Sequence, residues 1–329
     1  MYILFIIFLL SYVLGRLDTT NYFIDIFDQL SFQVLLGGII LFFILIFSKK
    51  LKTSVACILI CFLLAADILP TCKHCNAFLK NQTQNDNKIR IMTFNTGYES
   101  DDNLPKWYLG LEKLIIKNKS SGLNDIKNLE TLKKVILFEN PDIVHFLEIT
   151  QEFKDKIKSF ESIFPYNYLI QYKFPGIADS IFISKYPFKK NNNTKNHSGI
   201  AKIIVNETEL NILSVHLYSA LNQNRFKIVD KQIQIIKNLI ENTNQNLILI
   251  GDFNMTPISK RFINFLEDTN LYTYTSFVHP TSTWPAILPN FLGIQIDHVL
   301  FSENFKMIMK KTTKNLGSDH RALIVDLVF

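Results

Sequence analysis

Cysteine is scarce in this sequence, with four residues in a chain of 329. Cys57 and Cys61 lie inside an apolar run and are predicted to be small packing residues. Cys72 and Cys75 have no second C-x-x-C pair to complete a zinc site, and Asn76 stands where covalent haem attachment requires histidine. We therefore expect either a local disulfide or two free thiols at Cys72 and Cys75.

The sequence also lacks internal repeats and any basic run typical of a sequence-specific DNA reader, which argues against repeat architectures and that class of binding protein. Charged residues are few, at 19%, against 48% hydrophobic residues. The hydrophobic excess is concentrated in about the first 70 residues, so the remainder has the composition of an ordinary globular domain. The net charge of +6 suits an anionic substrate or a membrane surface, and equally no specific partner.

Three apolar runs open the chain, at about Tyr2–Leu14, Phe32–Phe47 and Val55–Leu69. Each is at the short end of the roughly 17–25 residues that cross a bilayer, and flanking residues can extend them. The second run has no polar face, which disfavours a helical hairpin of a soluble domain. The first run lacks the basic start and cleavage site of a signal peptide, so an anchor is the preferred interpretation.

We therefore predict about three transmembrane helices within an anchor region, residues 1–75, followed by an Asn- and Gln-rich linker, residues 76–87. The first connecting loop carries Arg16 among three aspartates, whereas the second carries three lysines between residues 49 and 52. The excess of lysine places the second loop in the cytoplasm. The protein is then a multi-pass membrane protein whose residues after Leu69 lie outside the cytoplasm. The lipid bilayer is its predicted partner, and no protein partner can be inferred.

Short β-type runs and helical patterns fill the third predicted region, residues 88–329. Many strands with a few intervening helices predict a layered α/β or α+β domain. The expected strands are Ile89–Phe94, Ile143–Leu147, Asn167–Gln171, Ser180–Ser184, Ile200–Val205, Leu210–His216, Leu247–Gly251, Ile296–Phe301 and Ala322–Val328. The expected helices are Asn124–Glu139, Asn224–Glu241 and Ile258–Asp268.

Polar side chains follow several of these apolar runs. Asp252 and Asn254 come directly after one that ends at Gly251, and side chains two residues apart on an extended segment point the same way. They could be simple turn formers, or they could hold a metal-bound phosphate and an attacking water. Matching groups end or flank other apolar runs: Asn95, Glu148, His216, Asp297, Asp319 and His320.

In order, spacing and flanks, these segments resemble the endonuclease/exonuclease/phosphatase superfamily, the DNase I-like fold, from about Lys88 to Phe329. The segment Thr283-Trp284-Pro285 is similar to a bacterial subgroup that carries an N-terminal membrane anchor. The resemblance implies an α/β four-layer sandwich, in which two packed mixed β-sheets are flanked by helices on both outer faces.

The resemblance also implies a metal site that binds Mg²⁺, with Mn²⁺ as the alternative ion. Its residues would be Asn95, Glu148 and Asp319. Glu148 also stands out by itself, because a carboxylate at the end of an apolar strand is costly unless it is paired or bound to metal. A hard cation on oxygen ligands would neutralise the charge of a phosphate ester and stabilise the leaving oxygen.

The catalytic residues implied by the resemblance are His216, Asp252, Asn254, Asp297 and His320. Asp252 and Asn254 match the pair that orients the attacking water. His320 matches the histidine that contacts the scissile phosphate, Asp297 the carboxylate that holds its imidazole, and His216 a residue that binds phosphate or acts as an acid. The other strand histidines, His145 and His298, are predicted to be structural.

We therefore expect a membrane-anchored, Mg²⁺-dependent phosphoesterase, either a nuclease or a lipid or sugar-phosphate phosphodiesterase. Its substrate would be a phosphate ester of nucleic acid, phospholipid or sugar phosphate. The alternative is a catalytically silent, membrane-anchored binding or scaffold protein that retains the fold. Silent members lose metal or water-orienting residues, whereas all of these are present here.

Overall fold

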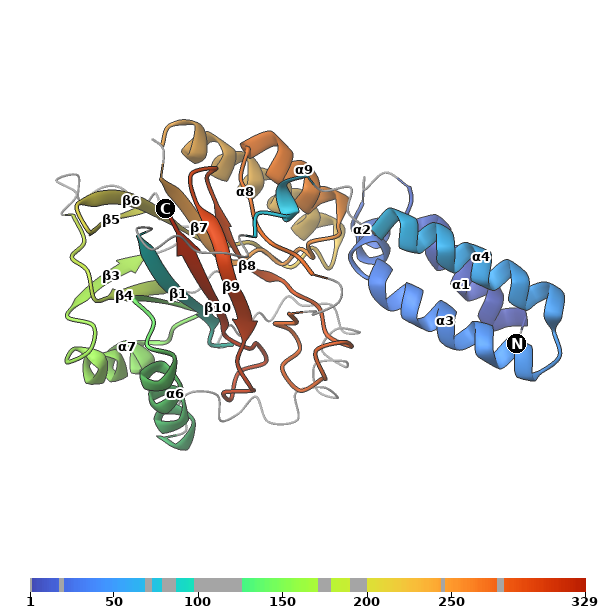
Figure 1. Cartoon of the computed structure of the whole chain (residues 1–329), viewed down its shortest axis with the longest axis horizontal. Helices are drawn as coiled ribbons and strands as arrows, with labels where there is room; N and C mark the ends of the chain where they lie inside the picture. The colour runs from blue at the N-terminus through green and yellow to red at the C-terminus, as the bar shows by residue number, and fades with distance from the viewer. Residues whose placement is uncertain are drawn as a thin grey trace.

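The structure is a computed structural model of the chain, and it describes residues 2–17, 21–68, 73–78, 87–97, 126–170, 179–189, 200–243, 246–276 and 281–329. Figure 1 shows a β-rich body and a helical bundle that projects from one side of it.

Cys72 and most of the predicted linker lie outside the described residues. Cys75 is disulfide-bonded, which excludes a free thiol at this cysteine, and Cys57 and Cys61 are free.

Two β-sheets form the centre of the body. The strands are β1 (Lys88–Asn95), β2 (Ile143–Leu147), β3 (Tyr166–Ile170), β4 (Ser180–Ser184), β5 (Ile200–Val205), β6 (Thr208–His216), β7 (Leu247–Asp252), β8 (Asp297–Phe301), β9 (Lys306–Thr312) and β10 (Leu323–Val328). The larger sheet has the order β3-β4-β2-β1-β10-β9 and the smaller the order β5-β6-β7-β8. Both are mixed, because β1–β2 and β6–β7 pair in parallel and their other neighbours are antiparallel.

Apolar side chains fill three layers around the two sheets. One layer lies between the sheets and contains Ile91, Phe182, Ile212, Ile250 and Phe301. Helices α6 (Ile126–Glu139) and α7 (Gln151–Ile157) cover the outer face of the larger sheet, and α8 (Gln223–Glu241) and α9 (Lys260–Thr269) cover that of the smaller sheet. Strands buried on both faces read as continuous apolar runs, which is why they could be predicted. The predicted four-layer sandwich is confirmed.

The sequence prediction omitted two elements of the body. Strand β9 lies at the edge of the larger sheet and carries three lysines. Such charges protect an edge strand from pairing with other chains, and they also obscure its apolar pattern. Helix α7 has seven residues, too few for a helical period to show, and Thr150 caps it by accepting a hydrogen bond from Phe153 N.

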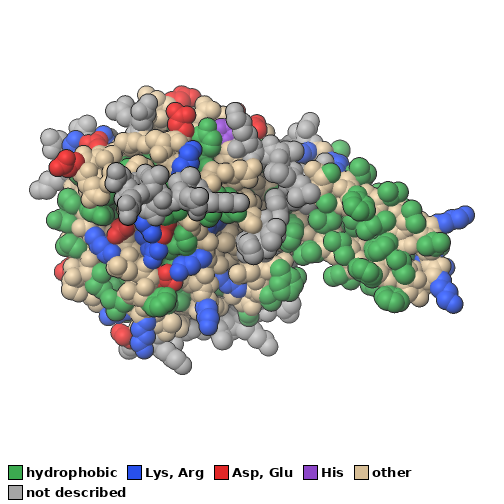
Figure 2. Space-filling view, in the orientation of Figure 1, with side chains coloured by type: hydrophobic (Ala, Val, Ile, Leu, Met, Phe, Trp, Pro, Cys, Tyr) green, Lys and Arg blue, Asp and Glu red, His purple; other side chains and the backbone are tan. Residues whose placement is uncertain are grey.

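The bundle consists of α1 (Tyr2–Leu14), α3 (Ser31–Phe47) and α4 (Leu51–Ile68), so each predicted apolar run forms a helix. It packs around Phe8, Leu45 and Cys61, and Gly38 permits the close approach, because a Cβ there would lie 2.5 Å from the Phe8 ring. Figure 2 shows apolar side chains over the outside of the bundle and basic ones at its far tip.

The described part of the chain contains no single helix that is both long and apolar enough to span a membrane. Helix α2 (Tyr22–Gln29) and α3 meet these criteria together, with a bend of 62° between them. The prediction of three separate transmembrane helices is therefore not confirmed.

Helix α2 was not predicted, because its two aspartates interrupt a short apolar segment. The structure shows why they are there. Asp28 accepts a hydrogen bond from the backbone N of Lys260, at the start of α9, and Asp25 lies 3.7 Å from the Arg261 guanidinium. Gln29 accepts a hydrogen bond from Thr256 N. Helix α2 is thus a polar connection between the bundle and the body.

Candidate active site

Strand pairing brings the predicted residues to one edge of both sheets, namely the edge at which β1, β2, β6 and β7 end. In the smaller sheet, Asp252 at the end of β7 lies opposite His216 at the end of β6 and opposite Asp297 at the start of β8. In the larger sheet, Asn95 ends β1 opposite Leu147, the last residue of β2, and Glu148 directly follows it. The register of backbone hydrogen bonds therefore sets the positions of these side chains.

Asn95 joins the two sheets at this edge. Its side-chain amide donates hydrogen bonds to Glu148 Oε1 at 2.9 Å and to Asp252 Oδ2 at 3.1 Å. Glu148 has a left-handed backbone, with φ of 53°, and Thr96 Oγ1 donates to its carbonyl oxygen. This turn directs the carboxylate back across the strand ends, where Oε1 lies 3.4 Å from His216 Nε2.

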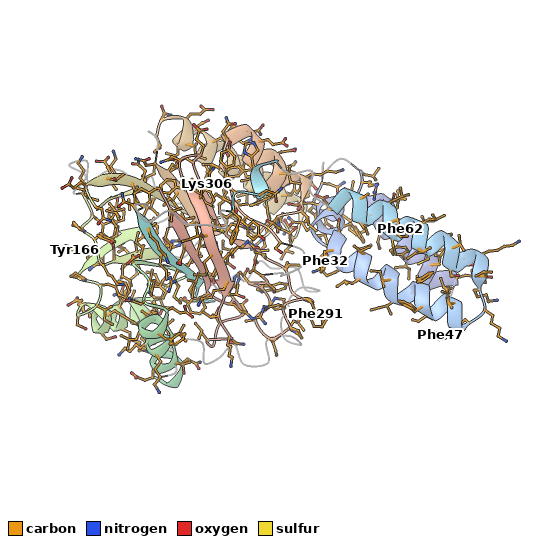
Figure 3. The ribbon with its side chains drawn as sticks, viewed as in Figure 1. Phe32, Phe47, Phe62, Tyr166, Phe291 and Lys306 are labelled. Atoms are coloured by element: carbon orange, nitrogen blue, oxygen red, sulfur yellow. The ribbon has the colours of Figure 1, made fainter. Side chains whose placement is uncertain are left out.

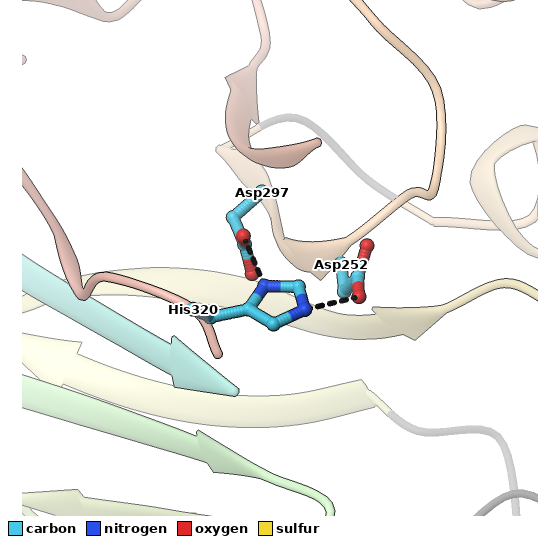
Figure 4. A group of neighbouring side chains, drawn as sticks. All are labelled: Asp252, Asp297 and His320. Atoms are coloured by element: carbon cyan, nitrogen blue, oxygen red, sulfur yellow. Dashed lines mark hydrogen bonds and ion pairs between the residues drawn. The ribbon is translucent and has the colours of Figure 1, made fainter. Parts of the chain in front are cut away.

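A second group is formed by Asp297, His320 and Asp252 (Figure 4). The imidazole of His320 lies between the two carboxylates, with Nδ1 2.8 Å from Asp297 Oδ2 and Nε2 3.7 Å from Asp252 Oδ2. Thr283 Oγ1 accepts a hydrogen bond from Asp297 N and so fixes the start of β8. The hydrogen bond at Nδ1 directs Nε2 toward the rest of the cluster.

Burial and charge shift the protonation equilibria of this group in a way that suits catalysis. Burial by itself lowers the pKa of His320, but the nearby charge and hydrogen bond of Asp297, with the charges of Asp252 and Asp319, outweigh it. The pKa of His320 therefore lies well above its usual value. Burial, and then the charge of Asp297, raise the pKa of Asp252 to about 7. At neutral pH the site thus holds a protonated ring beside a carboxyl group suited to exchange a proton.

Asn254 and Asp319 complete the predicted set. Asn254 has φ of 49°, its backbone N donates to Asp252 Oδ1, and its side chain bonds Leu217 O and the hydroxyl of Ser219. The Asn254 amide is thus held firmly in place.

Asp319 is half-buried and accepts a hydrogen bond from the indole of Trp284 at 3.3 Å.

Three residues of the site carried no predicted role: Gly97, Trp284 and Ser219. Gly97 has φ of 73°, a conformation that favours glycine, and a Cβ there would lie 2.5 Å from Asp319 Oδ1 and displace that carboxylate. Trp284 belongs to a segment that the sequence singled out only as a resemblance. Ser219 follows His216 by three residues with no pattern that would mark it. Loop conformation, rather than strand periodicity, brings these three residues to the site.

The two histidines that were predicted to be structural, His145 and His298, are both buried. His145 lies between the sheets with Nε2 2.7 Å from Ser214 Oγ, and burial lowers its pKa to about 3. His298 points to the opposite face of β8 from Asp297, where it packs against the Phe262 ring and contacts Met255 O. Both side chains therefore lie where the sequence placed them, His145 within the sheet core and His298 on the face opposite Asp297.

The family model described as "Endonuclease/Exonuclease/phosphatase family" matches residues 92–320, a range that includes all eight predicted site residues and ends at His320. The chain belongs to this family. Membership assigns it to the hydrolases of phosphate esters. No curated protein matches its sequence.

Solved structures have a similar fold. A family protein from Bacteroides thetaiotaomicron is 15% identical, with 74% of this chain and 98% of that chain covered and a TM-score of 0.51. Beta toxin from Staphylococcus aureus, as a mutant with bound magnesium ions, is 14% identical, with 73% and 99% covered and a TM-score of 0.50. At these identities the likeness supports the fold alone.

The side chains at this edge fit a hard divalent cation. Glu148, Asp252, Asp297 and Asp319 gather four carboxylates, and Oδ1 of Asp297 is buried with no hydrogen-bond partner among the described residues. Oxygen ligands of this kind are those that Mg²⁺ prefers. A carboxylate oxygen of Asp252, one of Asp297 and a ring nitrogen of His320 lie within 4.8 Å of one another, which is close enough for them to share a metal ion. The raised pKa of His320 keeps its ring protonated, and a protonated ring is a proton donor rather than a metal ligand. The ion therefore fits better beside Glu148, Asn95 and Asp319.

Replacing Asp297 with asparagine is expected to shift the alkaline side of the pH–rate profile. The variant keeps an acceptor for Nδ1 but removes the charge that raises the pKa of His320. If the protonated ring is the active form, activity falls as pH rises through that pKa, and in Asp297→Asn this fall should come about one to three pH units lower. The profile of kcat/KM against pH measures the shift. An unchanged alkaline limb would contradict the pairing of these two residues.

Proposed function

We propose that this protein is a membrane-anchored, Mg²⁺-dependent phosphoesterase that hydrolyses phosphodiester or phosphomonoester bonds, with Mn²⁺ as an alternative ion. The observation that carries the proposal is the continuous network from Glu148 through Asn95 and Asp252 to His320 and Asp297. It combines oxygen ligands for a cation, a carboxyl group with a pKa near neutrality and a protonated imidazole. A silent scaffold would have no use for this costly buried charge.

Each residue of the network has a role that its contacts support. When bound beside Glu148, Asn95 and Asp319, Mg²⁺ would neutralise the phosphate and stabilise the leaving oxygen. Asp252 takes the proton of the attacking water, which Asn254 helps to orient from its fixed position. The protonated His320 donates from Nε2 to a phosphate oxygen while Asp297 holds the ring. His216, beside Glu148, binds the phosphate or supplies a proton to the leaving group.

We further propose that the bundle crosses a bilayer and that the body lies outside the cytoplasm. The N-terminus and the lysine-bearing connection between α3 and α4 lie at the end of the bundle far from the body (Figure 1). The outward-facing side chains of the bundle are mostly apolar (Figure 2). The disulfide at Cys75 is typical of an oxidising compartment. The apolar exterior supports insertion in a bilayer, and the other two observations support this orientation.

Reporter fusions test this orientation. Alkaline phosphatase, which needs an oxidising compartment, should be active when fused after Phe329, and a fluorescent protein that matures only in the cytoplasm should be dark there. The matched control is a truncation after Lys50 in the lysine-bearing connection, where the two reporters should behave in the opposite way. A dark phosphatase and a bright fluorescent protein after Phe329 would place the active site in the cytoplasm.

The catalytic proposal is tested on the full chain, purified in lipid nanodiscs. It should be assayed with Mg²⁺, and again with a chelator, on plasmid DNA, RNA, a phospholipid, sphingomyelin and a sugar phosphate. Hydrolysis of at least one substrate that the chelator abolishes is the expected result. If neither Mg²⁺ nor Mn²⁺ supports hydrolysis of any of these substrates, the result would contradict the proposed activity and favour a catalytically silent scaffold protein.

A further inference from the structure

A loop beside the active site exposes large apolar side chains. Between Ala286 and Gly293, which are both buried, Ile287 is 61% exposed, Phe291 56% and Leu292 44%. These three side chains, here called the apolar tip, gather at one loop and leave its apolar area in contact with solvent. Soluble surfaces rarely group such residues unless they bind a partner or a membrane.

The position of the apolar tip is fixed relative to the bundle. Gln33 donates a hydrogen bond to Gly293 O at 3.0 Å, so the loop contacts the first turn of α3. Phe32 and Gln33 also line a cavity together with Asn290 and Gly293. Figure 3 shows Phe291 and Phe32 where the bundle meets the body. The apolar tip therefore lies beside the end of α3 that is nearest the active site.

The length of α3 sets the depth of this contact in a bilayer. Its 17 residues span about 26 Å at 1.5 Å per residue, slightly less than the roughly 30 Å of a hydrocarbon core. The whole helix is therefore needed to cross, and Gln33 must lie near the boundary between the hydrocarbon and the headgroups. The loop bonded to Gln33 is then at the same boundary, with its apolar side chains uncovered.

The loop is also connected rigidly to the catalytic residues. Arg321, which directly follows His320, is buried and donates hydrogen bonds to the carbonyl oxygens of Ser282, Ala286 and Leu288. Ala286 N donates to the backbone oxygen of Asp319 at 2.7 Å. A membrane contact at the apolar tip would therefore hold the active site at a fixed, short distance from the lipid headgroups.

We propose that Ile287, Phe291 and Leu292 insert into the outer leaflet of the bilayer that the bundle crosses, and that the active site acts on the phosphate esters of lipid headgroups. This inference rests on the proposed phosphoesterase function and membrane anchor. The bundle holds the apolar tip at the membrane, which gives the tip a high effective concentration there. Even a weak tendency to insert is then enough for the inserted state to be populated. Insertion at the headgroup boundary is favourable because it buries the apolar surface of these side chains.

Fluorescence quenching tests the insertion without any need for activity. Phe291→Trp should be placed in nanodiscs of phosphatidylcholine, either plain or brominated in the acyl chains, and the signal of the two native tryptophans subtracted with the unsubstituted protein. Phe138→Trp is the matched control, because Phe138 is also an exposed phenylalanine and lies on α6, away from the bundle (Figure 1). We expect strong quenching at position 291 and almost none at 138. Equal quenching at the two positions would overturn the proposal.

Activity on two kinds of substrate tests the second half of the proposal. Phe291→Ser should lower hydrolysis of a phospholipid in the nanodisc at least about tenfold and leave hydrolysis of bis(p-nitrophenyl) phosphate unchanged, since the apolar tip does not contact the reacting atoms. Phe138→Ser should change neither rate. Equal losses on both substrates would overturn the proposal. A protein that is quenched at position 291 but hydrolyses neither substrate would instead contradict the proposed catalytic function.

Discussion

Asp252→Asn is expected to lower kcat by about 10²- to 10⁴-fold, the range that a lost general base typically costs. The carboxyl group is buried, and burial with the charge of Asp297 raises its pKa to about 7, so it can accept the proton of the attacking water near neutral pH. Asparagine has the same shape but cannot take a proton. The rate should be measured on the same phosphodiester for both proteins at pH 8.

The pH dependence of the same variant separates the loss of a base from a loss of structure. In the unsubstituted protein, activity should rise as pH passes through the pKa of Asp252, because only the ionised form is a base. A bound cation lowers that pKa, so with Mg²⁺ the rise should come below pH 7. In Asp252→Asn this limb should vanish. The control is Asp268→Asn, an exposed aspartate on α9 paired with Lys237. A kcat for Asp252→Asn within tenfold of the unsubstituted protein would remove Asp252 from the catalytic step.

Glu148→Gln should reduce turnover by about 10³-fold at limiting Mg²⁺, equivalent to about 4 kcal/mol of lost transition-state stabilisation. The amide keeps an oxygen for the hydrogen bond from Asn95 but removes the negative charge that a hard cation requires. The Mg²⁺ concentration that gives half-maximal activity should rise accordingly. Measurement of rate against Mg²⁺ concentration tests this directly.

Thermal stability provides a second measurement for Glu148. Mg²⁺ that binds the folded state should raise the Tm of the unsubstituted protein, and it should do so much less in Glu148→Gln. Glu152→Gln is the matched control, because Glu152 is exposed on α7 and pairs only with Lys156 among the described residues. Equal Mg²⁺ dependence of rate and Tm in both variants would exclude Glu148 as a ligand.

The sequence was sufficient to predict the strands that build the two sheets. Strands such as β2, β4, β7 and β10 are buried on both faces, so burial selects a largely apolar run at each. Strand β9 has one face near solvent and lysines at the sheet edge, and α2 carries aspartates for a partner distant in sequence. Their patterns reflect tertiary contacts that only the folded chain reveals.

The candidate site was predictable to the extent that strands determine it. Asn95, His216 and Asp252 each end a strand, and β6 and β7 run in parallel, so their proximity follows from the order of strands that the family resemblance implied. Gly97 and Trp284 act through loops, where neither periodicity nor composition indicates what a side chain will contact. The position of the apolar tip at the end of α3 is likewise a property of the assembled molecule, since Gln33 and Gly293 are 260 residues apart.

Metal-dependent catalysis at this cluster is tested most directly by removing the metal from the full chain in nanodiscs and then restoring it. Hydrolysis of a phosphodiester should be measured first with Mg²⁺, then after chelation and removal of the chelator, and finally after Mg²⁺ is restored. We expect activity in the first and last conditions and none in the second, with Glu148→Gln about 10³-fold less active at the same limiting Mg²⁺ concentration. Hydrolysis that persists without metal, or that is equal in Glu148→Gln, would contradict a metal-dependent phosphoesterase centred on this cluster.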